Sequence, residues 1–369
     1  MRIFWVVNEL NLKLGADTIL NFPKTDSVAV LSLLKGGPQE KILSRAGVKI
    51  IKLDFLSFFD ARPWKHLRRA KSLLFILASP WIITRVSREI KKFNAQVVHT
   101  NLWLSDIIGI TAAQRAGIKN IISTQHDNVP IAPLPTLLKR HLLKKVKLVI
   151  AISEAVKDFT KAYFFVPDEK IRIIYNGINL DYFEKCQKAE KDWDGSIGVF
   201  ARLEKIKGHI FLLEAMREMA LHTTAPKIYI VGSGSQEKFL KNFSEANNLN
   251  VEFIPLTPNI APILGKVDIV VIPSLSEGFG VVVIEALAAK KLVIASNVGG
   301  IKELIFSKKT GILFNPGDYT DLKEKLVEAL NTKEASLEIS SKGRLWLMKN
   351  KYLFDIKNTA NEYRNLYSL

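Results

Sequence analysis

The chain has 369 residues, of which 48% are hydrophobic and 24% are charged. One hydrophobic core usually stops growing at roughly 250–300 residues, and this composition excludes a disordered or fibrous protein, so two globular domains are expected. The single cysteine, Cys186, excludes an intramolecular disulfide framework and a zinc site built from cysteines. No metal site is expected from the six histidines either, because they lack the spacing of known histidine metal motifs.

Positive charge is concentrated in the first half of the chain. The net charge at pH 7 is +17. Residues 1–180 carry 28 Lys and Arg against 13 Asp and Glu, a net of +15, whereas residues 181–369 carry 25 against 23, a net of +2. This uneven excess indicates an anionic partner of the first half, for which nucleic acid, anionic lipid and a phosphorylated substrate are the candidates.

The first half alternates between strand-like and helix-like segments. The apolar run in Met1–Leu10 is too short for a signal peptide, because Asn8 and Glu9 interrupt it, and it predicts a buried strand. Helices are expected at 64–93 and 105–117. The expected strands are 3–7, 27–33, 48–53, 95–100, 120–126, 147–153 and 171–178.

A second cycle of the same kind follows a polar, charged segment near 180–195. Its expected strands are 196–203, 227–235, 251–255, 267–274 and 292–297, and its helices are 209–220, 236–248 and 278–290. The repeated βα order predicts an α/β fold with two Rossmann-like, doubly wound parallel-sheet domains facing a cleft, with boundaries at 1–180 and 181–350. Such sheets bind ligands at the carboxyl ends of their strands, so we expect the active site between the domains.

The longest uncharged run, 72–84, has 13 residues and contains Pro80. It is shorter than the about 20 apolar residues that a bilayer-spanning helix needs. Tryptophans with basic flanks are typical of a segment that lies on an anionic membrane surface, and the alternative is a core-facing helix pair with a solvated basic side. Trp81 lies within this run, and its flanks contain Arg62, Trp64, Lys65, Arg68, Arg69, Lys71, Arg85, Arg88, Lys91 and Lys92. A second basic cluster consists of Lys139, Arg140, Lys144, Lys145 and Lys147.

The run Pro273–Gly280 ends a predicted buried strand at a Ser/Gly turn that opens a helix. Free backbone N–H groups at a helix start suit a phosphate, and Gly278 and Gly280 let a ligand approach the main chain closely. Glu277 lies in the turn. Glu285 lies inside a strongly apolar helix, where an unpaired carboxylate is costly, so it is expected either to accept hydrogen bonds from ligand hydroxyls or to pair with a lysine.

Two cations close the first strand of the second half. Arg202 and Lys207 are five residues apart and precede Gly208. Arginine grips phosphate with two parallel hydrogen bonds and lysine adds a mobile charge, so the pair predicts a diphosphate clamp, with a solvated basic turn as the alternative. Gly232 and Gly234 form another strand-end turn, but the third glycine of the dinucleotide fingerprint is missing, which leaves a plain tight turn equally open.

The first half offers weaker candidates. Gly15 follows the first strand, where its N–H can contact a phosphate. His126 ends the strand 120–126 at a position expected to line the cleft, and His99 ends a neighbouring strand, although a lone histidine is more often structural. The chain has neither a Walker A lysine motif nor the nucleophile elbow of a serine hydrolase.

Together these motifs resemble the family-4 retaining glycosyltransferases of the GT-B fold, over nearly the whole chain. The family's Glu-x7-Glu pair appears as Glu277 and Glu285, and its Arg-x4-Lys pair as Arg202 and Lys207. The resemblance implies a nucleotide diphospho-sugar donor, with the diphosphate on the two cations, the donor sugar on Glu277 and the ribose on Glu285. The other implied donor-binding residues are Gly15, Gly232, Gly234, Gly278, Phe279, Gly280 and Val281, and His126 is the implied catalytic residue of the first domain.

The same resemblance implies that domain 1–180 binds the acceptor, that domain 181–350 binds the donor, and that a C-terminal helix at 351–369 crosses back to the first domain. The sequence departs from the family pattern at two places. The loop Leu14–Asp17 has one glycine where the family usually has a pair and a glutamate, and Lys290–Leu292 replaces the usual Gly-x-Pro.

We therefore expect a retaining hexosyl- or N-acetylhexosaminyltransferase that prefers a UDP-sugar to a GDP-sugar. Because Arg202 and Lys207 can stabilise the leaving diphosphate, no metal or other cofactor is expected. The basic first half predicts a glycan or lipid-linked saccharide acceptor in cell-envelope polysaccharide synthesis, such as that of lipopolysaccharide. The expected location is the cytoplasm, on the inner face of the cytoplasmic membrane.

Other functions stay open at this point. They include a soluble-acceptor glycosyltransferase, a sugar phosphorylase or epimerase of the same fold, and a catalytically silent binding subunit. A nicotinamide-dependent oxidoreductase lacks the full glycine fingerprint here. A nucleic-acid-binding protein is the distant alternative, because no recognition motif is present and a glutamate-rich cleft repels phosphate backbones.

Overall fold

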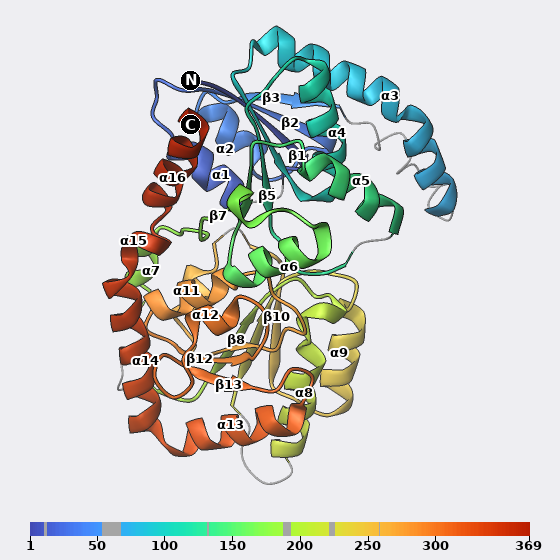
Figure 1. The fold of residues 1–369 in the computed structure, drawn as a ribbon. Coiled ribbons are helices and arrows are strands. Elements are labelled where there is room, and N and C mark those ends of the chain that lie inside the picture. The colour runs from blue at the N-terminus through green and yellow to red at the C-terminus, as the bar shows by residue number, and fades with distance from the viewer. Residues whose placement is uncertain (11–12, 54–67, 131–132, 187–192, 221–225, 258) are drawn as a thin grey trace. The chain divides into compact units, whose positions relative to one another are not determined.

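The computed structural model describes residues 1–10, 13–53, 68–130, 133–186, 193–220, 226–257 and 259–369 (Figure 1). The chain divides into two compact units. Unit 1 comprises Met1–Gly177 and Ile356–Leu369, and unit 2 comprises Ile178–Asp355. The chain passes from unit 1 to unit 2 after Gly177, and it returns to unit 1 with the C-terminal segment that starts at Ile356.

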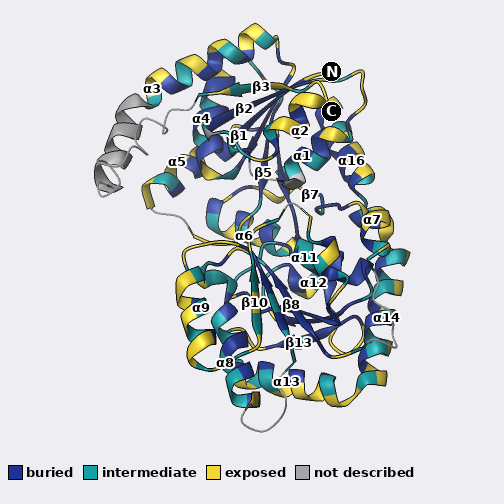
Figure 2. Cartoon of the chain, turned by 180° about the vertical axis from the view of Figure 1, so that it is seen from behind, coloured by how far each residue is buried: buried dark blue, intermediate teal, exposed yellow. Residues whose placement is uncertain are grey.

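Unit 1 contains a seven-stranded sheet in which every neighbouring pair is parallel, in the order β3-β2-β1-β4-β5-β6-β7. The strands are β1 (Arg2–Glu9), β2 (Ser27–Lys35), β3 (Lys49–Lys52), β4 (Val97–Asn101), β5 (Ile121–Gln125), β6 (Leu148–Ala151) and β7 (Ile171–Ile173). The inner strands β4, β5 and β6 are buried along their whole length. Figure 2 shows β1 and β2 of the same sheet largely in the dark blue of buried residues. Helices on both faces explain why these strands are buried at every position and do not alternate between buried and exposed residues.

The helices of unit 1 are α1 (Lys13–Leu20), α2 (Glu40–Arg45), α3 (Arg68–Phe93), α4 (Leu102–Arg115), α5 (Pro133–Leu143), α6 (Glu154–Phe164) and α16 (Ile356–Ser368). α6 begins where the Ser153 side chain accepts a hydrogen bond from the Val156 N–H at 3.0 Å, the usual geometry of a serine cap. α5 was not predicted, because two prolines and three adjacent basic residues hide its helical period. In the part of the chain that the structure describes, no helix combines the length and apolarity needed to cross a bilayer.

The C-terminal segment is anchored to unit 1 through a buried aromatic cluster. Tyr363 and Tyr367 of α16 pack into the core of the sheet with Trp5. His99 stacks on Trp5 with ring centroids 4.2 Å apart, and its Nδ1 lies 2.7 Å from the Tyr367 hydroxyl. Burial holds the pKa of His99 well below 6.5, and its Nε2 lies 2.9 Å from the Thr124 hydroxyl. His99 therefore supports the fold and does not line a ligand site.

Unit 2 contains a six-stranded parallel sheet in the order β10-β9-β8-β11-β12-β13. The strands are β8 (Ile197–Phe200), β9 (Ile228–Val231), β10 (Val251–Ile254), β11 (Ile269–Ile272), β12 (Leu292–Ser296) and β13 (Ile312–Phe314). The helices are α7 (Leu180–Glu184), α8 (His209–Ala220), α9 (Glu237–Ala246), α10 (Ala261–Leu264), α11 (Val281–Ala288), α12 (Ile301–Leu304), α13 (Tyr319–Asn331), α14 (Lys333–Lys349) and α15 (Lys351–Phe354). The segment expected as one helix at 351–369 is thus two helices, α15 in unit 2 and α16 in unit 1.

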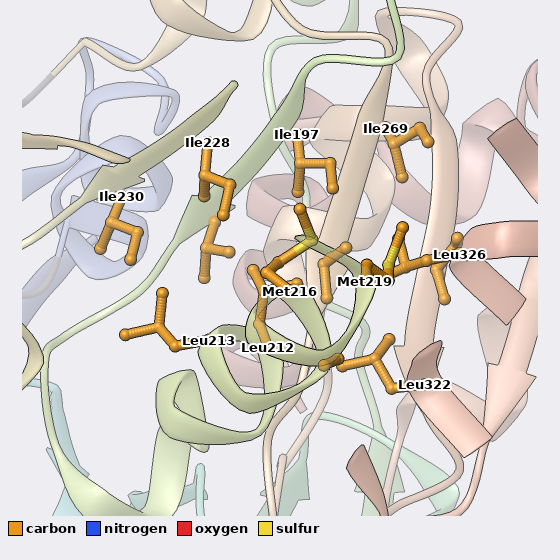
Figure 3. Packing of buried hydrophobic residues seen from close by; sticks show 14 of the residues in the cluster. Ile197, Leu212, Leu213, Met216, Met219, Ile228, Ile230, Ile269, Leu322 and Leu326 are labelled. Atoms are coloured by element: carbon orange, nitrogen blue, oxygen red, sulfur yellow. The ribbon is translucent and has the colours of Figure 1, made fainter. Parts of the chain in front are cut away.

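The core of unit 2 lies between its sheet and the helices α8 and α13, which pack side by side. Figure 3 shows Leu212 and Met216 of α8 pointing at Ile197 and Ile228 of the sheet, with Leu322 of α13 beside them. All of these side chains are fully or almost fully buried. On the other side α11 packs against α14, so the prediction of a doubly wound sheet is confirmed for this unit.

Candidate functional site

Two of the site residues expected in unit 2, Lys207 and Glu277, meet on loops that follow neighbouring strands. Lys207 closes the short 3-10 helix Lys205–Lys207 after β8, and Glu277 lies after β11, which pairs with β8. The Lys207 Nζ lies 2.6 Å from Glu277 Oε2, and the Ser274 hydroxyl donates to the same oxygen at 3.3 Å. Because parallel strands end at one edge, residues 70 positions apart become an ion pair.

Gly208 allows this close approach. Its φ is +66°, and a Cβ at this position would lie 1.9 Å from the Pro273 carbonyl oxygen. Only glycine fits such a position without moving the backbone. The Leu275 N–H then donates to the Ile206 carbonyl at 2.8 Å, which ties the loop of Glu277 to the loop of Lys207.

Arg202 lies at the start of the same loop as Lys207 and is exposed to solvent. The glycine turn that follows β9 packs closely against the backbone on either side of Arg202. A Cβ on Gly232 would lie 2.0 Å from the Ala201 carbonyl oxygen, and one on Gly234 would lie 2.4 Å from the Leu203 carbonyl oxygen. The structure therefore gives Gly232 and Gly234 a packing role beside Arg202. Their contact with a donor stays a prediction.

The helix α11 starts directly behind Glu277. Gly280 precedes its first residue, Val281, and no side chain caps this helix. The Val283 N–H of the first turn donates to the Gly280 carbonyl at 2.9 Å. Phe279 is buried, and its ring packs on Phe354 with ring centroids 6.3 Å apart. Glu285 lies on α11 with 8% of its surface exposed.

A cavity of 540 Å³ opens beside the clamp loop, between the first turns of α8 and α9. Its wall includes Glu204, Lys205 and His209. His209 is buried, and burial together with the charge of Lys207 lowers its pKa to about 4, so the ring is neutral at pH 7. Sequence reasoning did not single out His209, because nothing in its spacing distinguishes it from a core residue.

In unit 1 the structure places His126 directly after β5 and Gly15 in the first half of α1. Gly15 was expected in a loop. It instead lies within α1. Gly15 and His126 line the same small cavity of 40 Å³. Two candidates that the sequence placed 111 positions apart are therefore neighbours.

His126 also lines a second cavity of 220 Å³ at the ends of β4 and β5, together with Trp103, Asp127 and Lys139. Burial lowers the pKa of His126 below 6.5, the Asp127 and Asp106 carboxylates partly oppose this, and Lys139 adds to it. The imidazole is thus neutral at pH 7. Its Nε2 lies 3.0 Å from Asn101 Oδ1.

Lys139 belongs to the basic cluster expected on a surface, and this expectation is wrong for it. Its Nζ lies 3.0 Å from Asp106 Oδ2, and both side chains are buried. Asp106 also accepts hydrogen bonds from Thr100 at 2.6 Å and from Ser123 at 2.5 Å. A buried charge needs a paired and hydrogen-bonded partner, and the single acid of α4 supplies it.

Part of the basic segment 62–92 lies outside the described residues. Arg62, Trp64 and Lys65 fall in the undescribed range 54–67, and the side chains of 68–78 are not described either. From Trp81 onward the segment is visible as the second half of α3, where Trp81, Arg85, Arg88, Lys91 and Lys92 are exposed. Among the described residues, no group of three His, Cys, Asp or Glu side chains is arranged to hold a metal ion.

Two family models divide the chain between them. The model described as "Glycosyl transferases group 1" matches residues 183–346, and the model described as "Glycosyltransferase Family 4" matches residues 52–182. An uncharacterized glycosyltransferase of Methanocaldococcus jannaschii is 31% identical over 291 residues, which are 76% of this chain and 77% of that protein. A D-inositol 3-phosphate glycosyltransferase of Segniliparus rotundus is 28% identical over 59% of this chain and 54% of its own length.

Solved structures agree on the fold. Anabaena HepE in complex with UDP-glucose superposes with a TM-score of 0.79 at 19% identity over 100% of both chains. The structure of TarM superposes with a TM-score of 0.74 at 15% identity, over 100% of this chain and 99% of TarM. The predicted GT-B fold with two Rossmann-like domains is confirmed. The chain belongs to the family-4 glycosyltransferases.

Proposed function

We propose that this chain is a retaining glycosyltransferase that moves a hexosyl or N-acetylhexosaminyl group from a UDP-sugar to a saccharide acceptor. The observation that carries the proposal is the contact of Lys207 with Glu277 beside Arg202, at the uncapped start of α11. Complexes of structural neighbours with UDP and UDP-glucose support the choice of nucleotide. Unit 2 binds the donor in this proposal, and unit 1 binds the acceptor.

The donor diphosphate lies between the two cations and the first turn of α11. Arg202 is exposed and offers its guanidinium as a two-pronged donor. Lys207 shares its ammonium protons between a phosphate oxygen and Glu277, so the carboxylate orients it. The main-chain groups from Phe279 to Val281 add hydrogen bonds and the positive end of the helix dipole.

The two glutamates bind the hydroxyl groups of the donor, which are its uncharged polar groups. Glu277 accepts hydrogen bonds from the donor-sugar hydroxyls, since it stands in the turn beside the diphosphate position. Glu285 is eight residues further along, buried in α11, and accepts from the ribose hydroxyls.

Transfer proceeds by attack on the face of the sugar that the leaving group vacates. The bond from the anomeric carbon to the diphosphate oxygen breaks and a bond to the acceptor oxygen forms. The acceptor proton passes to the departing phosphate oxygen. Arg202 and Lys207 stabilise the negative charge that develops on the diphosphate, so the proposal includes no metal ion.

Alanine at both Arg202 and Lys207 tests the clamp. Removing one preorganised donor of this kind costs roughly 10²–10³-fold in rate, so UDP release from the double variant should fall by at least 10³-fold. Lys205→Ala in the same loop is the matched control and should keep its turnover. Undiminished turnover of the double variant contradicts the clamp, inverted anomeric configuration in the product contradicts retention, and loss of activity in EDTA contradicts metal-free transfer.

The 220 Å³ cavity of unit 1 supports a saccharide as the acceptor. Its wall offers Trp103, 41% exposed, and the hydrogen-bonding side chains of His126, Asp127 and Lys139. An aromatic face packs against the C–H face of a sugar ring, while charged and amide groups bind its hydroxyls. Trp103→Ala should raise the KM for acceptor and leave the KM for donor unchanged.

A membrane-bound acceptor in cell-envelope polysaccharide synthesis is the finer part of the proposal. α5 exposes Leu134, Leu137 and Leu138, whose i, i+3, i+4 spacing places them on one face of the helix. Lys144 and Lys145 follow and are exposed. An apolar stripe beside lysines fits the interface of an anionic bilayer, and the location in this proposal is the inner face of the cytoplasmic membrane.

Vesicle flotation at low salt tests the membrane contact. The protein should float with vesicles of phosphatidylcholine and phosphatidylglycerol more than with phosphatidylcholine alone, and serine at Leu134, Leu137 and Leu138 together should abolish this. Leu345→Ser, which changes an exposed leucine of α14, is the control. Equal partitioning onto both vesicles favours a soluble acceptor. Self-association that the triple variant removes assigns the stripe to a second copy of the chain.

A further inference from the structure

Asn101 occupies the position before α4 in an unusual way. Asparagine there normally accepts a hydrogen bond from the backbone of the first helical turn. Its side chain makes no such bond, and its Oδ1 lies 3.0 Å from His126 Nε2. The residue best suited to cap this helix is turned towards the histidine instead.

The surrounding backbone is arranged to make this possible. Leu102, the first residue of α4, has a φ of +72°, in the left-handed region that a leucine rarely adopts. Two other side chains take over at the helix start. The Ser105 hydroxyl accepts from the Asn101 N–H at 3.0 Å, and Asn8 Oδ1 accepts from the Ser105 N–H at 3.0 Å. Strain kept in place by other residues is typical of a functional site.

We propose that Asn101 is a positioning residue that holds His126 as the Nε2–H tautomer. A carbonyl oxygen only accepts, so Nε2 must donate, and in a neutral ring Nδ1 then carries no proton. His126 therefore meets its substrate as a hydrogen-bond acceptor at Nδ1. The inference rests on the proposed function only in giving His126 a substrate.

The charges around the ring are compatible with this neutral tautomer. Asp127 follows His126 in the chain, Asp106 faces it from α4 and Lys139 from α5. Glu9 of β1 lines the small cavity with His126 and Asn101. Since Lys139 is paired with Asp106, the nearest buried acid does not compete with Asn101 for the Nε2 proton.

Nitrogen-15 NMR of histidine-labelled protein at pH 7.5 tests the tautomer directly. His126, assigned by its loss in His126→Gln, should show a protonated Nε2 and an unprotonated Nδ1. Asn101→Ala should give a mixture of the two tautomers. Ser105→Ala is the control, because it removes a bond at the same helix start without touching His126. It should lower the melting temperature and leave the tautomer unchanged.

Kinetics give an independent readout. Asn101→Ala should lower kcat by roughly 10-fold to 100-fold, the range typical of a partner that orients a histidine, with little change in the KM for donor. Asn101→Asp also accepts from Nε2 and should restore the tautomer, while its charge raises the His126 pKa and moves the acidic limb of the pH–rate profile to higher pH.

Three results overturn the proposal. They are a wild-type ring protonated at Nδ1, an Asn101→Ala ring that keeps the wild-type tautomer, and a Ser105→Ala ring that loses it. If no UDP-sugar is turned over by the wild type, the proposed function fails while the tautomer result still stands. The two failures are thus distinguishable.

Discussion

The clamp of unit 2 and the His126 region of unit 1 are built in different ways. In unit 2 the candidate residues lie on the loops that follow β8, β9 and β11 and in α11, within motifs that are visible in the sequence. In unit 1 the corresponding environment comes from single residues on β4, β5, α4 and α5, held by buried hydrogen bonds. A site on motif-bearing loops is readable from spacing, whereas a site made by packing is not.

The largest expected effect is a loss of unfolding free energy when the packed site of unit 1 is disrupted. Asp106→Asn leaves Lys139 buried without its charge partner, and removing one member of a buried ion pair costs about 3–5 kcal/mol. Urea unfolding should show this loss. Glu328→Gln, which breaks the exposed pair of Glu328 with Lys308, should cost less than about 1 kcal/mol. Equal losses of unfolding free energy would mean that the buried pair of Lys139 and Asp106 stabilises the fold no more than the exposed pair does.

The next largest effect is a loss of turnover when the ion pair of Lys207 and Glu277 in unit 2 is disrupted. Glu277→Gln keeps the shape of the side chain but removes the charge that holds Lys207. Steady-state release of UDP should fall by about 10²-fold, with the melting temperature nearly unchanged. Glu245→Gln on the exposed face of α9 should leave turnover as it is. A large fall in stability with Glu277→Gln would assign the ion pair to folding and not to the donor.

Comparing alanine at Gly208 with alanine at Gly47 separates the cost of a strained backbone from the cost of a steric collision. Gly208→Ala should cost about 3 kcal/mol, because it combines a positive φ with a collision against Pro273. Gly47 has a φ of +82° and open space around its Cβ position, so Gly47→Ala should cost only about 1 kcal/mol. Chemical denaturation of both variants gives the difference. Equal losses would show that the two loops do not need the close approach.

The smallest effect compares the pH dependence of the two units. Folding lowers the pKa of His209 to about 4, so the unfolded chain binds more protons below pH 6.5 and stability must fall as the pH drops from 6.5 towards 4. His209 should account for about 2 kcal/mol of loss between pH 6.5 and 5. In His209→Leu this part of the pH dependence should disappear, while that from His99 and His126 remains. An unchanged slope would mean that folding does not lower the pKa of His209.

The sequence by itself determined the fold class, the two-domain division near residue 180 and the family. Apolar runs of strand length, separated by helical periods, leave a parallel α/β arrangement as the only way to bury both faces of each sheet. Arg202, Lys207, Glu277 and Glu285 could be named as candidates because each belongs to a motif of two residues less than ten positions apart, and their contact with a donor stays a prediction.

Only the tertiary structure decided which polar residues are paired and how. Lys139 reads as a surface lysine in the sequence, but α5 brings it against Asp106. His99 was a weak candidate for a cleft-lining residue, and the contact with Tyr367 of α16 shows that it is a core residue. Asn101 and His126 are 25 positions apart and meet because β4 and β5 end side by side. Such contacts depend on strand register and on helix packing, which a spacing pattern within one segment does not encode.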